Sequence, residues 1–231
     1  MYELFIGNKN YSSWSLRPWV LMKAHGIAFV EHLMPFRDGS NFDEFRAFSP
    51  SGKVPCLRDG TTVVWDSLGI AEYLAERHAG LLPTDATARA WARCASAEMH
   101  SGFGTLRQIC SMNVGLRVRL HSRPAGLEAD IRRIDELWNE GLHRFGGPFL
   151  AGSGFTVADA FYCPVAYRIR TYGIELTGAA RDYAGRLLQL PAMLEWEGAA
   201  LAEPWREASH EREVTEYGNI TADLRGRVEA R

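Results

Sequence analysis

The chain has 231 residues, of which 46% are hydrophobic and 23% charged, so a largely disordered protein is excluded and one large domain or two modest ones remain. Lys and Arg number 26 against 28 Asp and Glu, which gives a net charge of -2 and argues against a nucleic-acid partner held by a basic surface. The apolar stretches are too short to span a bilayer, and the cysteines form no C-x-x-C pair and no metal-ligand spacing. We therefore expect a cytoplasmic protein with mostly buried free thiols, no metal and no membrane partner.

The first 80 residues alternate short β-type and helical segments. Strands are predicted over residues 2–6, 29–34, 54–58 and 61–65. Helices are predicted from Ser12 to about Gly26, over residues 41–48, and from Asp66 to about Ala75. Asp59-Gly60 separates the last two β-type runs and is a strong hairpin signal. The order β-α-β-(α)-β-β-α predicts a small α/β layer with a mixed sheet.

After a connector at residues 81–88, the pattern is helical, and no strand is predicted. One long helix is expected over residues 87–113, and others over 127–145, 156–172 and 191–202. Thr156 and Asp159 form the capping-box-like start of the third of these helices, in which Pro164 is expected to cause a kink. The polar segment from about residue 206 is expected to be a loosely held, solvated tail; the alternative is that it folds over a cleft.

Two segments of the first part could bind a small, partly charged ligand. Residues 10–17 place serine hydroxyls at the start of a helix, where an anion or a thiolate can bind; plain capping by Ser13 or Ser15 is the simpler interpretation. Asp66-Ser67 also opens a helix, and the pair offers an acid for an ammonium group and a hydroxyl with backbone amides for a carboxylate. An α-amino-acid group needs that combination, although a simple N-cap explains the pair equally well.

A third segment, Lys53-Val54-Pro55, stands at the start of a predicted strand. A cis peptide bond before Pro55 would leave the backbone N–H and C=O of Val54 open to a peptide-like ligand. The alternative is an ordinary turn with Pro55 in trans. The neighbouring Gly52-Lys53 pair is not a phosphate loop, because Ala47 stands where the first glycine of that motif belongs.

Together these segments resemble the glutathione transferase family. The resemblance rests on Lys53-Val54-Pro55 followed a dozen residues later by Asp66-Ser67, and on Thr156–Asp159, which is similar to the family's capping box. It implies a thioredoxin-like α/β domain over residues 1–80, a linker over 81–88 and an all-α C-terminal domain over 89–231. The serines with Arg17 are similar to the serine-type classes (zeta, tau, theta and bacterial relatives). Trp14 stands where the zeta pattern has a cysteine, which argues against maleylacetoacetate isomerase activity.

The resemblance also implies roles for single residues. Ser12 is the expected activating serine, with Ser13 as the runner-up. Val54 would pair through its main chain with the cysteinyl part of glutathione, with Pro55 in cis. The remaining substrate-binding candidates are Lys53 for the glycyl carboxylate, Asp66 and Ser67 for the γ-glutamyl end, and Arg17, Trp14 and His100 beside them. For His100, a hydrogen-bonded position between helices is the alternative.

The function implied is that of a glutathione transferase, acting as a homodimer in detoxification with glutathione as co-substrate. A serine hydroxyl stabilises the glutathione thiolate, which then attacks a small electrophile or a peroxide. The alternatives are a non-catalytic binding or regulatory protein of the same fold, and a glutathione-dependent isomerase or dehalogenase. Tyr167, Arg168, Tyr172 and Trp205 are candidates for the electrophile pocket, with core packing as the alternative for each.

Overall fold

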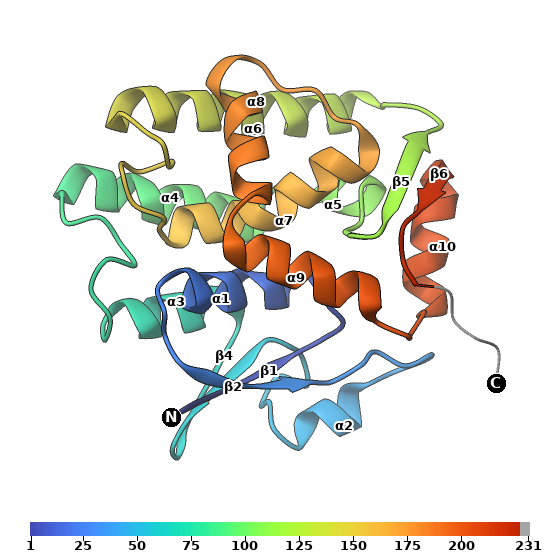
Figure 1. The fold of residues 1–231 in the computed structure, drawn as a ribbon, viewed down its shortest axis with the longest axis horizontal. Helices are drawn as coiled ribbons and strands as arrows, with labels where there is room; N and C mark the ends of the chain where they lie inside the picture. The colour runs from blue at the N-terminus through green and yellow to red at the C-terminus, as the bar shows by residue number, and fades with distance from the viewer. Residues whose placement is uncertain (227–231) are drawn as a thin grey trace.

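The computed structural model describes residues 1–226 and places a small sheet domain against a larger helical domain (Figure 1). The sheet contains β1 (Tyr2–Ile6), β2 (Phe29–Leu33), β3 (Cys56–Asp59) and β4 (Thr62–Trp65) in the order β2-β1-β3-β4. β1 pairs parallel with β2 and antiparallel with β3, and β3 pairs antiparallel with β4. The predicted mixed sheet and its four strands are therefore confirmed.

Three helices cover the two faces of this sheet: α1 (Ser13–Ala24), α2 (Phe42–Arg46) and α3 (Ser67–Ala75). Side chains alternate across a strand, so Leu4 and Ile6 of β1 enter the main core with α1 and α3, whereas Phe5 packs with Phe45 of α2 on the other face. Figure 1 shows α1 and α3 between the sheet and the helical domain, and α2 beyond the sheet. The three helices were all predicted.

The second domain is built around α7 (Val157–Tyr172), most of which is buried and which packs against α1 and α4. Its N-terminus carries the predicted capping box, in which Asp159 accepts from the backbone N–H of Thr156. The surrounding helices are α4 (Ala86–Ser101), α5 (Gly104–Ile109), α6 (Ala125–Phe145), α8 (Gly178–Leu188), α9 (Pro191–Ala202) and α10 (Ala208–Tyr217). Within residues 1–226, none of the helices combines the length and the apolar character needed to cross a membrane.

The single long helix predicted over residues 87–113 is wrong, because the chain breaks at Gly102 and Phe103. Gly102 caps α4, and a Cβ atom there would lie 2.7 Å from the carbonyl oxygen of Glu98. Phe103 has a φ of 57°, in the left-handed region that an α-helix cannot include. The chain therefore restarts as α5. Helix α8 had no predicted counterpart.

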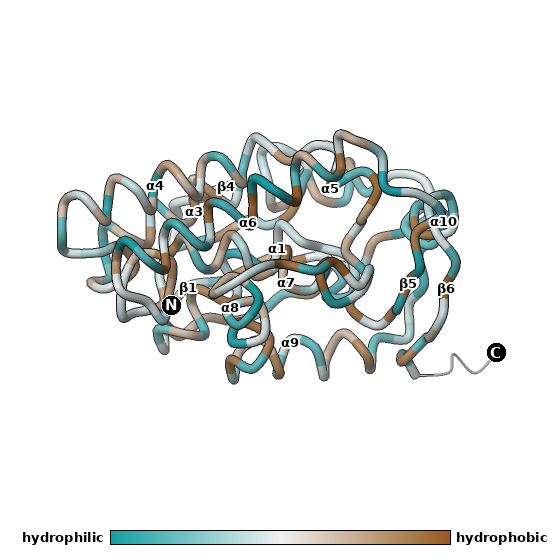
Figure 2. The backbone as a smooth tube through the Cα atoms, turned by 90° about the horizontal axis from the view of Figure 1, so that it is seen from above, coloured by the Kyte–Doolittle hydropathy of each residue, from teal (hydrophilic) through white to brown (hydrophobic). Residues whose placement is uncertain are grey.

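The predicted loosely held tail is also wrong for the residues that the structure describes. Residues 208–217 form α10, and β6 (Gly218–Asp223) pairs antiparallel with β5 (Leu116–Leu120), where no strand was predicted. The buried Arg225 ties the two elements together, since it donates to Glu211 (Nη2–Oε2 2.9 Å) and to Asp223 (Nη2–Oδ2 2.7 Å). Figure 2 shows β5, β6 and α10 gathered at one end of the molecule. The last part of the predicted tail, residues 227–231, lies outside the described residues.

Candidate functional site

Two adjoining cavities lie where the sheet domain meets the helical domain. The smaller, of about 440 Å³, is lined by Trp14, Ser51, Lys53, Val54, Pro55, Trp65, Asp66 and Ser67. The larger, of about 540 Å³, shares Trp14, Lys53 and Val54 with it and adds both Ser12 and Ser13. The structure therefore brings the three chemistry-bearing segments of the sequence together around one pair of cavities.

The sheet register explains this convergence. Phe5, near the end of β1, pairs with Cys56 at the start of β3, and Cys56 pairs in turn with Trp65 at the end of β4. The chain therefore leaves β1, enters β3 and leaves β4 at the same edge of the sheet. The serine segment follows β1, Val54-Pro55 precedes β3 with its peptide bond in cis as expected, and Asp66 follows β4.

Two helix N-termini open at this edge. Asp66, with a φ of 69°, caps α3 by accepting from the backbone N–H of Leu68 at 2.8 Å. Ser12 caps α1 by accepting from the N–H of Ser15 at 3.4 Å, so the cap is Ser12 rather than Ser13 or Ser15. The free first-turn amides and the helix dipoles make this edge favourable for negative charge.

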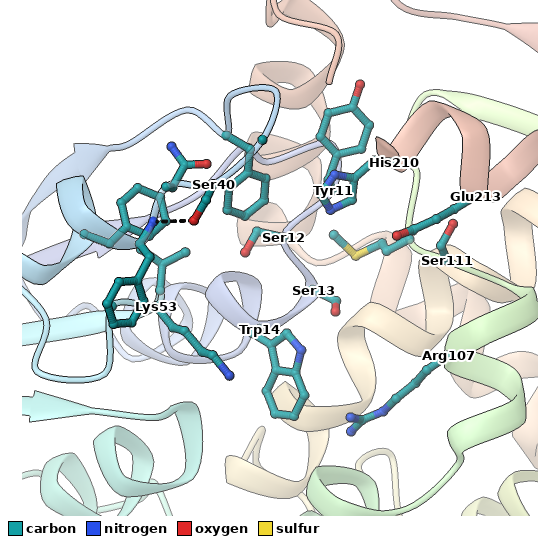
Figure 3. A pocket seen from close by; sticks show the side chains of 18 of the residues that line it. Tyr11, Ser12, Ser13, Trp14, Ser40, Lys53, Arg107, Ser111, His210 and Glu213 are labelled. Carbon is teal, nitrogen blue, oxygen red and sulfur yellow. Dashed lines mark hydrogen bonds between the residues drawn. The ribbon is translucent and has the colours of Figure 1, made fainter. Parts of the chain in front are cut away.

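The two candidate serines differ in their hydrogen bonds. The Ser12 hydroxyl donates to Ser15 Oγ at 2.7 Å, and Ser15 Oγ also accepts from the N–H of Gly7 at 3.1 Å. The Ser13 hydroxyl instead accepts from Arg168 Nη2 at 3.3 Å, and no acceptor for its proton lies among residues 1–226. The Ser13 hydroxyl can therefore donate a hydrogen bond to a group in the larger cavity. The Ser12 hydroxyl already donates its hydrogen bond to Ser15. In Figure 3 the hydroxyl groups of both residues lie beside the cavity, that of Ser13 on the side of Trp14.

Arg17 and His100 line neither cavity but lie behind Trp14, which lines both. The buried Arg17 donates to Ser67 Oγ at 3.1 Å, and its guanidinium carbon lies 4.1 Å from the centre of the Trp14 ring. His100 Nε2 lies 3.6 Å from Asp66 Oδ2, and its ring meets that of Trp14 edge to face. Burial lowers the pKa of His100 even though Asp66 opposes this shift, so the His100 ring is largely neutral at pH 7. Both residues support the walls of the site.

The larger cavity is also lined by residues that no sequence motif had indicated. Phe36, Phe42 and Phe45 line it from the sheet domain, Arg107, Ser111 and Met112 from the helical domain, and His210 and Glu213 from α10. Arg168, which the sequence had offered as a candidate for the electrophile pocket, also lines it. The spacing of Phe42 and Phe45 had predicted α2 but gave no sign that it forms a wall. For α10, the sequence offered only the alternative that the polar segment from about residue 206 folds over a cleft, and its place in the cavity wall agrees with that alternative.

Other side chains near the site contribute to the core or to its edge. Tyr11 lines the larger cavity, but its hydroxyl donates to Glu211 at 2.7 Å, and burial raises its pKa. Tyr167 and Tyr172 are buried and donate to the carbonyl groups of Met193 and Ser111, so core packing explains them. Trp205 is exposed and lines neither cavity.

Comparison with protein families identifies the N-terminal region. Residues 11–77 match the model "Glutathione S-transferase, N-terminal domain". The chain is 27% identical over 143 residues to a "Probable maleylacetoacetate isomerase" of Caenorhabditis elegans, a match that covers 58% of this chain and 64% of that protein. It is 26% identical over 182 residues to a "Maleylacetoacetate isomerase" of Mus musculus, covering 77% and 81% of the two chains.

Solved structures extend the likeness to nearly the whole chain. A theta class glutathione S-transferase of Xanthomonas axonopodis pv. citri with glutathione bound has a TM-score of 0.62 at 24% identity, covering 84% of this chain and 95% of that one. Glutathione S-transferase isozyme E7 of Drosophila melanogaster has a TM-score of 0.67 at 21% identity, covering 94% and 97%. These likenesses confirm the fold that the resemblance implied.

Proposed function

Because residues 11–77 belong to the N-terminal domain family of the glutathione S-transferases and the whole chain has their fold, we propose that this protein activates glutathione for attack on a small electrophile. The observation that carries the proposal is the convergence of three segments on one pair of joined cavities: the serines, Val54-Pro55 and Asp66-Ser67. The same fold with those segments dispersed or blocked would support binding or regulation only.

The smaller cavity suits glutathione. Asp66 and Ser67 at the start of α3 supply the acid and the hydroxyl for the γ-glutamyl end, and Lys53 supplies a positive charge for the glycyl carboxylate. The Val54 backbone lies between them for the cysteinyl part. Since Val54 and Trp14 line both cavities, a thiol held there faces the larger one.

Ser13 is the hydroxyl that we assign to the thiolate, with Ser12 as the alternative. Its proton has no acceptor in the described chain, and Arg168 occupies one of its lone pairs, so the hydroxyl is oriented to donate. A serine is too weak an acid to serve as a base, but a donated hydrogen bond stabilises the thiolate and lowers the thiol pKa from about 8.5. The thiolate then attacks the electrophile, and the leaving group departs.

The first experiment measures glutathione binding by calorimetry together with conjugation of an aryl halide. Asp66→Asn keeps the helix cap but removes the negative charge, and we expect the Kd for glutathione to rise about tenfold, because a hydrogen bond to a charged group is weakened. Glu76→Gln, an exposed residue at the end of the same helix, is the matched control and is expected to bind as the wild type. Wild-type protein that binds no glutathione would contradict the proposal. Binding without turnover on any electrophile would favour a regulatory protein.

A second candidate is glutathione-dependent isomerisation, which the relatives named maleylacetoacetate isomerase favour. In such a reaction the thiolate adds to a double bond and leaves after rotation, so glutathione is not consumed. Measuring glutathione consumption against substrate loss separates the two reactions. Peroxide reduction and dehalogenation by the same thiolate are tested with those substrates in the same assay.

The resemblance to the family also supports two wider proposals, that the chain forms a homodimer and that it acts in the cytoplasm in detoxification. Light scattering during gel filtration tests the first. Fractionation of the native cells tests the cytoplasmic location.

A further inference from the structure

Three guanidinium groups surround Trp14 and Ser13, and none of them takes part in an ion pair within the described chain. Those of Arg17 and Arg107 lie 4.1 Å and 4.6 Å from the centre of the Trp14 ring, and Arg168 contacts Ser13. Burial and the mutual repulsion of the three groups lower the pKa values of Arg17 and Arg168. The site therefore holds a concentration of positive charge that Asp66 and Glu213 offset only in part and without an ion pair among the described residues.

Neutral partners hold these groups in place. Arg168 donates to the carbonyl groups of Cys110 (2.8 Å) and Pro164 (3.3 Å), and Arg107 donates to those of Met99 and His100 at the end of α4. Such bonds fix the positions of the two groups but bring no negative charge. Burying a charge without an ion-pair partner is costly, most of all for Arg17 and Arg168, which are nearly fully buried, so its retention points to a ligand that supplies the counter-charge.

Arg107 and Arg168 both line the larger cavity, and Figure 3 shows the guanidinium group of Arg107 directed towards Trp14. Three phenylalanines of the sheet domain, Phe36, Phe42 and Phe45, also line this cavity. One carboxylate, that of Glu213 on α10, also lines the cavity and acts on Arg168 from a distance without forming an ion pair with it. The larger cavity thus combines apolar rings with guanidinium groups, and Ser13 lines it beside Trp14, which the two cavities share.

The charges around Trp14 indicate which counter-charge a bound ligand would supply. Asp66 partly offsets Arg17, and Glu213 together with a thiolate beside Ser13 would offset Arg168, which leaves Arg107 without a counter-charge. Resting on the proposed function, we infer that the acceptor substrate is an electrophile with an apolar body and a carboxylate, which Arg107 and Arg168 bind. A planar carboxylate matches the fork of N–H donors on a guanidinium group, and the apolar body fits against the phenylalanines.

Two aryl chlorides of equal shape test this inference: 4-chloro-3-nitrobenzoate and the neutral 4-chloro-3-nitrobenzamide. In each, the thiolate of glutathione forms a carbon–sulfur bond and chloride leaves with the electron pair of the carbon–chlorine bond. Dividing each kcat/KM by the rate of the uncatalysed reaction removes the difference in intrinsic reactivity. We expect this normalised value to be at least about tenfold higher for the benzoate, since one charge-assisted contact supplies that much.

Three variants then change the benzoate-to-benzamide ratio in known directions. Arg107→Met and Arg168→Met each remove a positive charge and are expected to lower the ratio several-fold, whatever they do to the absolute rate. Glu213→Gln removes the opposing carboxylate and is expected to raise it. A purely structural effect would not move the ratio in both directions. A wild-type ratio near one, or a ratio unchanged in both arginine variants, would overturn the inference.

The inference and the proposed function can fail separately. Turnover of both chlorides at equal normalised rates supports the transferase and removes the carboxylate preference. If neither chloride reacts, calorimetry of the benzoate and the benzamide with S-methylglutathione present measures the same preference as binding. Tighter binding of the benzoate, weakened by Arg107→Met, would then support the inference without the reaction, and equal binding would refute it.

Discussion

Ser12 and Ser13 are neighbours in the sequence, yet their surroundings assign them different tasks. Ser12 has both its lone pair and its proton engaged with Ser15 at the start of α1, whereas Ser13 receives a hydrogen bond from Arg168 and keeps its proton. Both are nearly buried, so exposure does not distinguish them. The difference lies entirely in which partners the fold places around each hydroxyl.

This difference in hydrogen bonding predicts that alanine substitutions at Ser12 and Ser13 affect different properties of the protein. Ser13→Ala should raise the pKa of the bound glutathione thiol by about one unit or more and lower the rate at neutral pH, because the thiolate loses its donor. Ser12→Ala should cost about 1 kcal/mol of folding stability through the lost cap and shift the thiol pKa little. Ultraviolet titration of the thiolate and urea unfolding measure the two effects. A thiol pKa that rises only in Ser12→Ala would return the activating role to Ser12.

At the scale of elements, α10 forms part of the wall of the larger cavity, and a capping residue at its N-terminus holds it there. Glu207 caps the helix, its carboxylate accepting from the backbone N–H groups of Ser209 (3.1 Å) and His210 (2.9 Å). The His210 ring stacks between those of Tyr11 and Phe36, with ring centres 4.9 Å and 5.3 Å away. The cap therefore holds a residue of the larger cavity in position.

The cap should make the stability of this region depend on pH. Burial by itself would raise the pKa of Glu207, but hydrogen bonds from Ser209 and His210 outweigh it and lower the pKa to about 2 from its ordinary 4.5. A lowered carboxylate pKa adds stability above pH 4.5, and this contribution is lost as the pH falls from 4.5 towards 2.

Glu207→Gln tests this dependence by replacing the carboxylate with a neutral amide. Urea unfolding should show the wild type to be more stable than the variant at about pH 7, with the gap narrowing at about pH 3. Glu213→Gln, on the same helix, serves as the control, because its carboxylate makes no such cap. A gap that is constant over this range would contradict the role of the Glu207 charge.

At the scale of the whole molecule, the helical domain holds the loop that carries the serines. Glu203, just after α9, accepts from the backbone N–H groups of Lys9 (2.6 Å) and Asn10 (3.2 Å), and Trp196 donates to the carbonyl of Lys9 at 2.8 Å. Glu203 is 5% exposed, and burial raises its pKa. The position of the serines thus depends on a domain that begins far along the chain.

Removing the Glu203 carboxylate, which holds the backbone of Lys9 and Asn10, should affect both folding stability and glutathione binding. Glu203→Ala leaves two buried N–H groups without acceptors and is expected to cost about 3 kcal/mol of unfolding free energy and to weaken glutathione binding. Glu195→Ala on the preceding helix removes only an exposed ion pair with Lys23 and should cost less than about 1 kcal/mol. Urea unfolding and calorimetry measure both variants. Equal losses of unfolding free energy and of glutathione affinity in the two variants would show that the Glu203 hydrogen bonds have no special role.

Much of the fold follows from local pattern in the sequence. The alternation of short β-type and helical runs, the Asp59-Gly60 hairpin and the Thr156–Asp159 capping box predicted the sheet domain and the central helix of the second domain. These signals are local because turn chemistry, capping and hydrophobic periodicity each involve residues a few positions apart. Gly102 shows the limit, since the close approach of the Glu98 carbonyl is not visible as periodicity.

By itself, the sequence determined which three short segments are candidates for the chemistry: those after β1, before β3 and after β4. The tertiary structure decided what surrounds them: the phenylalanines, the arginines that form no ion pair within residues 1–226, and α10, for which the sequence favoured a solvated tail. The physical reason is that a wall, a counter-charge or a strand partner such as β6 for β5 is a contact between distant residues. Such contacts arise from packing and pairing across the fold, and no local pattern records them.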